Sequence, residues 1–543
     1  MAKKNIRSFE NGITIVALII TVIILLILAG ISLNLVIGEN GIIKNAKQAK
    51  AETEKKSEEE ELRIILAKYE GKKLKINQSL KEYLNGKVKE IEDNEDGTLM
   101  VIVRKNEFNV DENTYDITEP TIFKVEDAKP GMLEGNGTED NPYVIASIED
   151  LVAFSNSVNG IKVNEKGEFE NVTPINYTQK YIALKQTLDF KSKKSYVDST
   201  RKDFGDINGN GIVEELKTEL ETEEGFMPIG KLSTFNGTFD GKENEIRRIH
   251  INREKNVGLF GNISKANIKN VGVTGKIIAT QCFGAGIVGQ GNGTISNCHN
   301  KADLSGCELG GIIGRAHGVE INNCYNEGNL NGVGYTNSYG VGGIVGRGAG
   351  SVVVISSYNK GKIYSDTHGS GGIVGRPEGF TKIVNCYNIG DLSGYNANGG
   401  IVGFSVSNVN ILNCYNKATI YCNKFLQFGG SGGIIGETYG NVTINNCINL
   451  GEVKSMREKG EMVGYIYGTP KITIDNAYYI TSSNQSIGYG TATGEAKEYS
   501  EEYMKSEKFV EELNYNILKV EDNKQWFNWK YNKDEFPTFI DKR

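Results

Sequence analysis

The side chains with the most regular spacing for chemistry are cysteines that share one phase of a repeat. They are Cys298, Cys324, Cys386, Cys414 and Cys447. Ser357 and Ala477 stand at the equivalent positions of two further repeats. Parallel strands stack about 4.8 Å apart, which lies within the Cα separation of a disulfide. The Ser and Ala replacements and the odd number of cysteines favour instead buried, reduced thiols that serve packing.

An aromatic residue follows the first five positions of this phase in unbroken succession. The set is His299, Tyr325, Tyr358, Tyr387 and Tyr415. If the cysteines point inward, these residues form an outward stripe, and stacked rings bind sugar faces or protein surfaces. Two other interpretations stay open: the rings only shield neighbouring coils, or the tyrosines point inward. Inward cysteines require a bend near Asn323, because strict alternation along a strand cannot bury both Ile321 and Cys324.

A calcium site is suggested by alternating oxygen side chains. Asp206, Asn208 and Asn210 match the first half of a calcium-binding loop. The second half departs from that pattern, because a lysine occupies the position of the bidentate acid and Glu214 would have to replace it. The alternative is that the charged insertion 192–224 is a solvated loop. No other cofactor is expected.

Catalytic chemistry finds little support in the sequence. The four histidines are scattered, and neither an HExxH pair nor a CxxC pair occurs. Polysaccharide hydrolysis needs paired carboxylates, whereas the acids within the repeats are sparse and unpatterned: Asp303, Glu320, Asp366, Glu378 and Asp391. We therefore predict that the protein is not an enzyme, with a glycan-active enzyme as the second alternative function.

A repeat of about 28 residues must position these side chains. Glycine-flanked apolar blocks mark it at 258–261, 286–289, 311–314, 343–346, 372–375, 400–403, 433–436 and 461–464. Two further β-prone runs follow most blocks, with no helical pattern between them. Three short strands per coil predict a mainly β chain, a three-sided parallel β-helix over residues 140–485. Asparagines such as Asn297 and Asn326 are expected to form ladders at its turns.

The blocks resemble the GLUG motif, short glycine-flanked apolar repeats of bacterial adhesins and of the non-catalytic part of immunoglobulin A peptidases. The resemblance covers about residues 135–485, including upstream segments at 135–143, 226–230 and 235–241. It implies a surface or adhesive role and names no ligand.

The N-terminus carries a candidate membrane segment. Residues 13–37 contain no charged side chain and are long enough to span a bilayer as a helix. The basic residues of the 1–12 leader predict a single-pass membrane protein with the C-terminal region extracellular, at the cell surface. A cleaved secretory signal is the competing interpretation.

The same junction resembles a type IV prepilin leader over about the first 70 residues. The resemblance implies cleavage after Gly12 and methylation of Ile13. Ala17 departs from the glutamate usual at the fifth mature position, which argues against assembly into a pilus. An uncleaved signal anchor is the alternative.

The remaining segments flank the β-helix. After the hydrophobic helix at 13–38 we expect a helical continuation at 39–71, with one apolar stripe of Leu62, Ile65, Leu66 and Tyr69. A small pilin-like β domain at 72–126 would cover that stripe, completing an α+β head, and 127–139 would be a linker. Residues 486–543 are expected to cap the open end of the solenoid, and the alternative is an aromatic ligand site.

Charge and composition narrow the function. The net charge is −7, so no global basic field exists to collect nucleic acid, which is excluded as a partner. We predict a membrane-anchored surface protein that acts as an adhesin-like binding module. Its expected partners are the membrane, an extracellular glycan, or a protein of a host or neighbouring cell. The first alternative is a minor pilin-like subunit of a type IV pilus or secretion pseudopilus.

Overall fold

The computed structural model separates the chain into two compact units, Met1–Pro120 and Thr121–Arg543. Each unit is described by itself. The described residues are 42–70, 79–93, 98–104, 107–111, 114–115, 117–118, 133–163, 169–190, 225–333, 340–422, 429–480, 482, 484–520 and 524–540.

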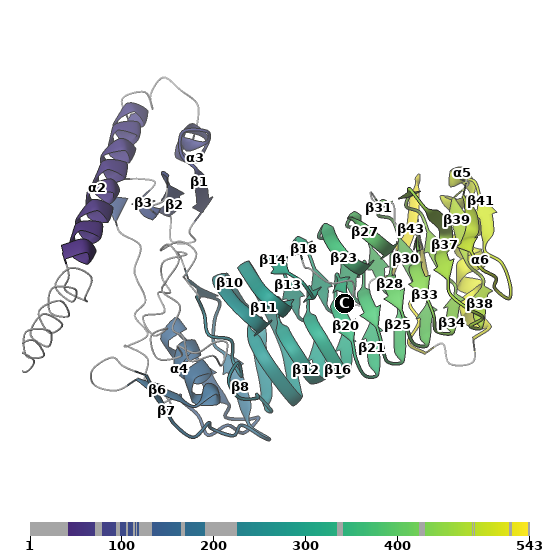
Figure 1. Cartoon of the computed structure of the whole chain (residues 1–543), viewed down its shortest axis with the longest axis horizontal. Helices are drawn as coiled ribbons and strands as arrows, with labels where there is room; N and C mark the ends of the chain where they lie inside the picture. The colour runs from purple at the N-terminus through teal and green to yellow at the C-terminus, as the bar shows by residue number, and fades with distance from the viewer. Residues whose placement is uncertain are drawn as a thin grey trace, which may run out of the picture. The chain divides into compact units, whose positions relative to one another are not determined.

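The first unit joins a long helix to a small antiparallel sheet (Figure 1). Its elements are α2 (Ile42–Glu70), α3 (Leu80–Leu84), β1 (Glu90–Asp93), β2 (Thr98–Ile102), β3 (Glu107–Asp111) and β4 (Ile117–Thr118). Leu62, Leu66 and Tyr69 of α2 are buried in one cluster with Leu99 and Phe108 of the sheet. The apolar stripe of the sequence therefore marks the face of α2 that the sheet covers.

The predicted membrane segment at 13–37 finds no support among the described helices. Residues 13–37, together with Gly12 and Ile13 of the prepilin-like junction, lie outside the described residues. Among the helices that the structure describes, none combines the length and the apolar character needed to cross a membrane. The prediction of a single-pass membrane protein is corrected accordingly.

The second unit begins with a short helix and the first strands. They are β5 (Tyr143–Ile145), α4 (Ile148–Asn159), β6 (Ile161–Val163), β7 (Phe169–Asn171), β8 (Tyr181–Leu184) and β9 (Leu188–Asp189). Ser147 and Asp150 form a capping box at the start of α4, and Gly160 ends it with a left-handed φ of 71°. Leu151 and Phe154 of α4 pack into the solenoid core.

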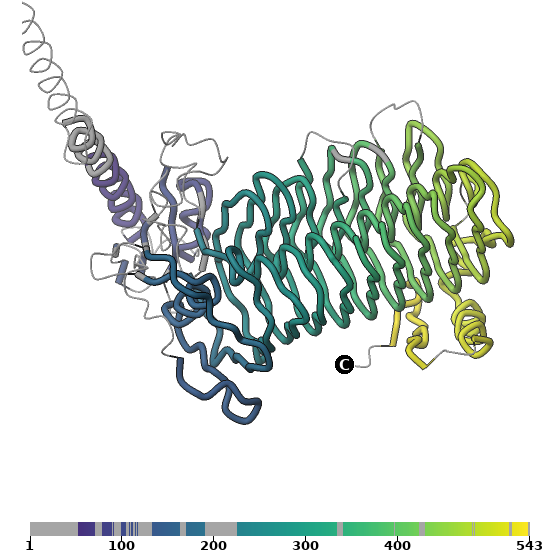
Figure 2. Tube along the Cα trace, turned by 60° about the horizontal axis from the view of Figure 1, so that its bottom comes forward, coloured from purple at the N-terminus to yellow at the C-terminus, as the bar shows by residue number. Residues whose placement is uncertain are grey.

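A parallel β-solenoid forms the body of this unit (Figures 1 and 2). Its strands are β10 (Thr238–Val257), β11 (Phe260–Ala285), β12 (Val288–Ser296), β13 (His299–Asn300), β14 (Asp303–Gly306), β15 (Leu309–Gly310), β16 (Ile313–Asn322), β17 (Tyr325–Asn326), β18 (Leu330–Gly332), β19 (Val341–Gly342), β20 (Val345–Gly348), β21 (Val352–Ile355), β22 (Tyr358–Asn359), β23 (Ile363–Gly371), β24 (Val374–Pro377), β25 (Thr381–Val384), β26 (Tyr387–Asn388), β27 (Leu392–Gly399), β28 (Val402–Ser405), β29 (Val409–Leu412), β30 (Tyr415–Asn416), β31 (Ile420–Cys422), β32 (Gly430–Gly432), β33 (Ile435–Thr438), β34 (Val442–Asn445), β35 (Ile448–Asn449), β36 (Val453–Ser455), β37 (Glu458–Ile466), β38 (Ile472–Asp475), β39 (Tyr478–Ile480), β40 (Gln485–Tyr489) and β41 (Lys497–Tyr499). Equivalent strands of successive coils pair in parallel, as Val345 of β20 does with Val374 of β24. The predicted mainly β solenoid is confirmed.

Left-handed asparagines turn the chain so that the cysteines face inward. Asn323 has a φ of 52°, and Asn413 has a φ of 53°; asparagine tolerates this region better than most residues. Ile321 before the bend and Cys324 after it are both fully buried. Cys298, Cys324, Cys386, Cys414 and Cys447 are all buried and free. The bend near Asn323 and the packing ladder of reduced thiols are confirmed.

A second asparagine ladder runs inside the solenoid. Asn300, Asn326, Asn359, Asn388, Asn416 and Asn449 are each at most 1% exposed. Each of the first five donates from Nδ2 to Oδ1 of the next, as Asn326 does to Asn359 at 2.8 Å. The first glycines of six blocks, from Gly286 to Gly433, lie against this ladder, and a Cβ on Gly343 would approach the Cβ of Asn359 to 2.5 Å. The predicted turn ladders are confirmed, and they explain why the blocks that lie against the inner ladder begin with glycine; the last block begins with Glu461, which accepts a hydrogen bond from Asn449 instead.

The C-terminal segment lies along the side of the solenoid instead of closing its open end. Its elements are α5 (Glu501–Met504), α6 (Glu507–Leu518), β42 (Trp529–Asn532) and β43 (Glu535–Phe539). Trp529 donates from Nε1 to Oδ1 of Asn413 at 2.7 Å, three coils before the last strands. Figure 2 shows the yellow segment beside the green coils. Of the predicted cap at 486–543, β40 and β41 pair with the preceding coil. The expected position at the end of the rod is wrong for the segment after them, because its apolar residues pack against Val384, Tyr415 and Ile448 of successive coils.

Candidate functional site

The predicted aromatic stripe is brought together as a continuous stack. Its members, called the aromatic stack below, are His299, Tyr325, Tyr358, Tyr387 and Tyr415. Successive ring centroids lie 4.8 to 4.9 Å apart, with interplanar angles of 2° to 8°. Each ring therefore sits one coil above its neighbour, at the spacing that the parallel ladder imposes.

The stack is only partly open to solvent. Tyr358 is 7% exposed and Tyr415 is 6% exposed, while the other three side chains are half-buried. Burial raises the pKa of Tyr415 well above its ordinary value, and the adjacent Tyr387 adds to this effect. A stack this deeply buried shields its coils as well as presenting ring edges.

Charged groups fix the first ring of the stack. His299 Nε2 lies 2.8 Å from Oε1 of Glu245, and Lys301 Nζ lies 2.9 Å from the same oxygen. Burial lowers the pKa of His299, although the hydrogen bond to Glu245 opposes this effect. Burial acts to raise the pKa of Glu245, but the hydrogen bonds from Lys301 and His299 outweigh it and the pKa is lowered.

The C-terminal segment covers the opposite end of the stack. The Tyr415 ring lies 5.7 Å from Trp529 and 5.4 Å from Phe539. The turn asparagines hold the segment in place: Asn413 Nδ2 donates to the carbonyl of Phe527 at 2.9 Å, and Phe527 N–H donates to Oδ1 of Asn385 at 2.9 Å. The same ladder that bends each coil therefore also binds this segment.

A cavity of about 340 Å³ lies where the segment meets the stack. Its lining residues carry no charge: Asn322, Asn323, Ser356, Tyr358, Asn385, Tyr387, Tyr415, Phe527, Thr538 and Phe539. Aromatic rings supply flat apolar surfaces, and the amides and hydroxyls supply neutral donors and acceptors. This combination suits an uncharged polar ligand with an apolar face, such as a sugar ring.

A second cavity, of about 560 Å³, lies beside Glu461. This carboxylate is 2% exposed and accepts from Asn449 at 2.6 Å, Ser482 at 2.7 Å and Asn484 at 2.8 Å. Because Glu461 accepts the last bond of the inner asparagine ladder, its role is to end that ladder.

Two buried glutamates were not predicted from the sequence. Glu308 and Glu437 are fully buried, and both come from coil positions where no pattern marks an acid. Burial raises the pKa of Glu308 to about 7, and the neighbouring Arg347 and Arg315 oppose that rise. Arg347 Nη1 lies 3.6 Å from the Glu308 carboxylate.

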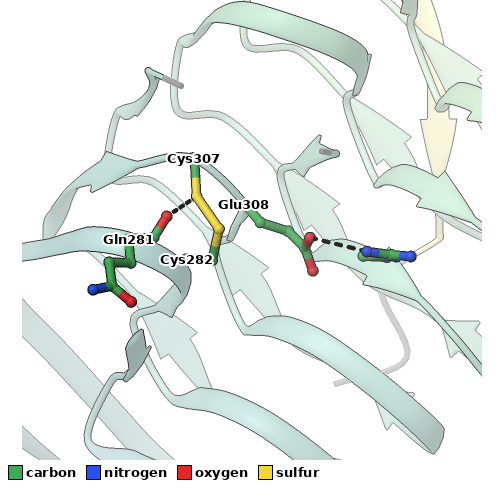
Figure 3. Close-up of a disulfide and its surroundings, with 5 residues drawn as sticks. Gln281, Cys282, Cys307 and Glu308 are labelled. Atoms are coloured by element: carbon green, nitrogen blue, oxygen red, sulfur yellow. Dashed lines mark hydrogen bonds and ion pairs between the residues drawn. A yellow bond between two sulfur atoms is a disulfide. The ribbon is translucent and has the colours of Figure 1, made fainter. Parts of the chain in front are cut away.

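A disulfide beside Glu308 was also not predicted from the sequence. Cys282 and Cys307 are bonded across neighbouring coils, with their Cα atoms 5.2 Å apart (Figure 3). A signal was available, because these two cysteines lie outside the shared ladder phase and are separated by 25 residues, one coil of the repeat.

The calcium hypothesis is not tested. Asp206, Asn208, Asn210 and Glu214 lie outside the described residues. Within the ranges given above, no cluster of three or more His, Cys, Asp or Glu side chains could hold a metal ion.

Comparison with known proteins finds a distant likeness among solved structures. No family model matches the chain, and no curated protein matches it. A solved structure described as a "putative immunoglobulin A1 protease from Bacteroides ovatus" is similar, with 18% identity over 75% of this chain and 94% of that chain and a TM-score of 0.32.

The protease name of that structure contradicts the prediction that this protein is not an enzyme, and the prediction is withdrawn. A TM-score of 0.32 at 18% identity does not assign an activity to this chain. The GLUG and prepilin-like resemblances stay predictions.

Proposed function

We propose that the protein is an adhesin-like binding module and that the cavity beside the aromatic stack takes an uncharged sugar ring of a glycan. The observation that carries the proposal is the lining of this cavity, in which Tyr358, Tyr387 and Phe539 stand beside Asn and Ser side chains and no charged group. Sugar rings pair an apolar face with hydroxyl edges, and this lining complements both.

The scaffold supports this role by its rigidity. We take each coil to be three-sided, as the three strands per repeat suggest, so that the stack follows one corner of the rod. The rings keep their spacing because the coil hydrogen bonds hold them, and a site on a rigid element loses little conformational entropy on binding. The resemblance of the glycine blocks to adhesin repeats agrees with a recognition role.

An array of neutral oligosaccharides, probed with the full chain, tests the proposal. We expect at least one neutral glycan to bind. Tyr387→Ala should weaken that binding about 3- to 10-fold, the effect of losing one aromatic contact. Thr538→Ala is a second variant that lines the cavity from an exposed position and leaves the stack intact.

Tyr364→Ala is the matched control, since Tyr364 is exposed on β23 and belongs to neither the stack nor the cavity. If no neutral glycan binds, or if both cavity variants bind as tightly as the wild type, the proposal is wrong. Binding of a protein ligand in place of a glycan, with the same loss in Tyr387→Ala, would also overturn the sugar assignment.

A further inference from the structure

A different column of the solenoid carries arginines on three consecutive coils. Arg315, Arg347 and Arg376 each follow the last glycine of a block, and they are direct partners in the parallel ladder. The equivalent position of later coils holds Phe404, then Glu437, Tyr465 and Tyr489 in register. One column therefore carries arginines at one end and, apart from the buried Glu437, aromatic residues at the other.

The arginine end has more positive than negative charge. Arg347 lies 2.7 Å from Glu378 and 3.6 Å from the buried Glu308, and Arg376 lies 3.0 Å from Glu378. Arg315 makes no ion pair with any described residue, and its buried Nε has no hydrogen-bond partner there. Three guanidinium groups thus face two carboxylates, one of which is fully buried.

The pKa of a histidine beside the arginines reflects their positive charge. Burial lowers the pKa of His317, and the positive charges of Arg315 and Arg347 lower it further. Glu437, at the aromatic end, is fully buried, whereas Glu458 is exposed there. The positive potential is therefore concentrated at the arginine end.

Ring contacts connect the arginines to the last tyrosines through Tyr439 and Tyr467, which lie two positions after Glu437 and Tyr465 of the column. Arg376 lies 5.1 Å above the Phe404 ring, and Phe404 lies 5.8 Å from Tyr439. Tyr439 stacks on Tyr467 at 4.2 Å, and Tyr465 lies 4.5 Å from Tyr467.

Two of the tyrosines at this end present their rings to solvent. Tyr465 stacks on Tyr489 at 4.5 Å. Tyr439 is 53% exposed and Tyr489 is 54% exposed, so these rings are open surface. The Tyr467 hydroxyl donates to buried Glu437 at 3.1 Å, which fixes the orientation of its ring.

We propose that this surface, called the arginine–tyrosine face, binds an acidic polysaccharide that lies along the axis of the rod. Guanidinium groups repeated on consecutive coils match anionic groups repeated along a chain, and they bind carboxylates and sulfates alike. The exposed tyrosines offer ring faces on which the sugars stack. Single-stranded nucleic acid is also a polyanion, and it is the competing occupant that the experiment below tests.

This site is independent of the proposed function. It shares no residue with the cavity beside the aromatic stack, and it takes a charged ligand where that cavity is lined by neutral groups. Loss of either binding activity leaves the other to be judged separately.

Binding of the full chain to polygalacturonate, heparin and dextran, measured calorimetrically at low and high salt, tests the proposal. We expect polygalacturonate, heparin or both to bind, with affinity that falls as salt rises, and dextran not to bind at this face. Arg315→Gln should weaken binding about 3- to 10-fold and reduce the salt dependence. Tyr489→Ala should weaken binding by a similar factor with an unchanged salt dependence.

Lys362→Gln and Tyr364→Ala are matched controls, because both residues are exposed and lie on other columns. Binding of polygalacturonate alone assigns carboxylates, and binding of heparin alone assigns sulfates. If neither binds at low salt, or if an Arg315→Gln/Tyr489→Ala double variant binds as tightly as the wild type, the proposal fails. It also fails if a single-stranded oligonucleotide binds as tightly and is lost in the same variants.

Discussion

The aromatic stack and the arginine–tyrosine face use the same residue type on the same scaffold in opposite ways. Tyr358 and Tyr415 of the stack are almost fully buried, and the C-terminal segment covers one end of it. Tyr439 and Tyr489 of the other face are more than half exposed, with rings held only by their own neighbours. Since tyrosines of neighbouring coils stack in both rows, as Tyr358 does on Tyr387 and Tyr439 on Tyr467, stacking alone does not separate a structural ladder from a recognition surface. What separates the two is the C-terminal segment, which packs against the aromatic stack and not against the exposed tyrosines of the arginine–tyrosine face.

The largest expected effect comes from removing the residue that covers the stack. Trp529 is 1% exposed and donates to Asn413. Trp529→Ala should destabilise the C-terminal segment by about 3 to 5 kcal/mol, through the cavity left by the indole and the lost hydrogen bond. Native-state hydrogen exchange should show faster exchange across β42 and β43, with the central coils unchanged.

A uniform slowing or acceleration across all coils in Trp529→Ala would contradict this local role of the segment. Tyr489→Ala is the control, since its ring is already exposed and its loss should leave exchange in the segment as it is.

Burial of Glu308 beside the arginine row is expected to make stability depend on pH. The pKa of this carboxyl rises from 4.5 to about 7 on folding, so the folded state favours the protonated form. The protonated carboxyl therefore contributes to the free energy of unfolding in full below pH 4.5, and this contribution is lost as pH rises through about 7. The loss amounts to about 3 kcal/mol at most. Glu308→Gln should therefore flatten the fall in stability between pH 5 and pH 8, measured by urea unfolding. An equally steep fall in the variant would remove Glu308 as its cause.

Two asparagines of one ladder position separate coil bending from segment binding. Asn297 and Asn413 have φ values of 52° and 53°, but only Asn413 also bonds to Phe527 and Trp529. Asn297→Ala should cost about 1 to 2 kcal/mol for the left-handed backbone. Asn413→Ala should cost about 2 to 4 kcal/mol, because buried partners are also left unsatisfied. Equal losses in thermal unfolding would mean that the segment adds nothing at this position.

The smallest expected effect is on the exposed tyrosines. Tyr439→Ala and Tyr489→Ala should each change stability by less than about 1 kcal/mol, because an exposed ring buries little surface. A thermal shift as large as that of Trp529→Ala would show that these rings are structural after all. Such a result would erase the contrast between the two rows.

Several features of this chain could be predicted from local sequence. The glycine blocks and the cysteine positions repeat in fixed phase, so the parallel coils followed from periodicity, with inward cysteines as one of two alternatives. The bend at Asn323 followed from alternation, because two buried positions an odd number of residues apart require a turn. The arginine row was also visible, since Arg315, Arg347 and Arg376 each follow a block, but an arginine after glycine carries no signal until the coils are in register.

Other features depend on contacts that no local pattern encodes. The C-terminal segment and the stack are over 100 residues apart in sequence, as in the bond of Trp529 to Asn413. The ion pair of Glu308 with Arg347 and the disulfide of Cys282 with Cys307 each join different coils.

By itself, the sequence determined the repeat and the strand direction, because hydrophobic burial acts on every coil with the same period. The inward orientation of the cysteines, which the sequence left open against inward tyrosines, was decided by the left-handed bend before each of them. Only the tertiary structure decided which tyrosine row is covered and which is open. That outcome depends on where one aperiodic apolar segment finds its largest buried contact, and this is a property of the assembled surface rather than of any single repeat.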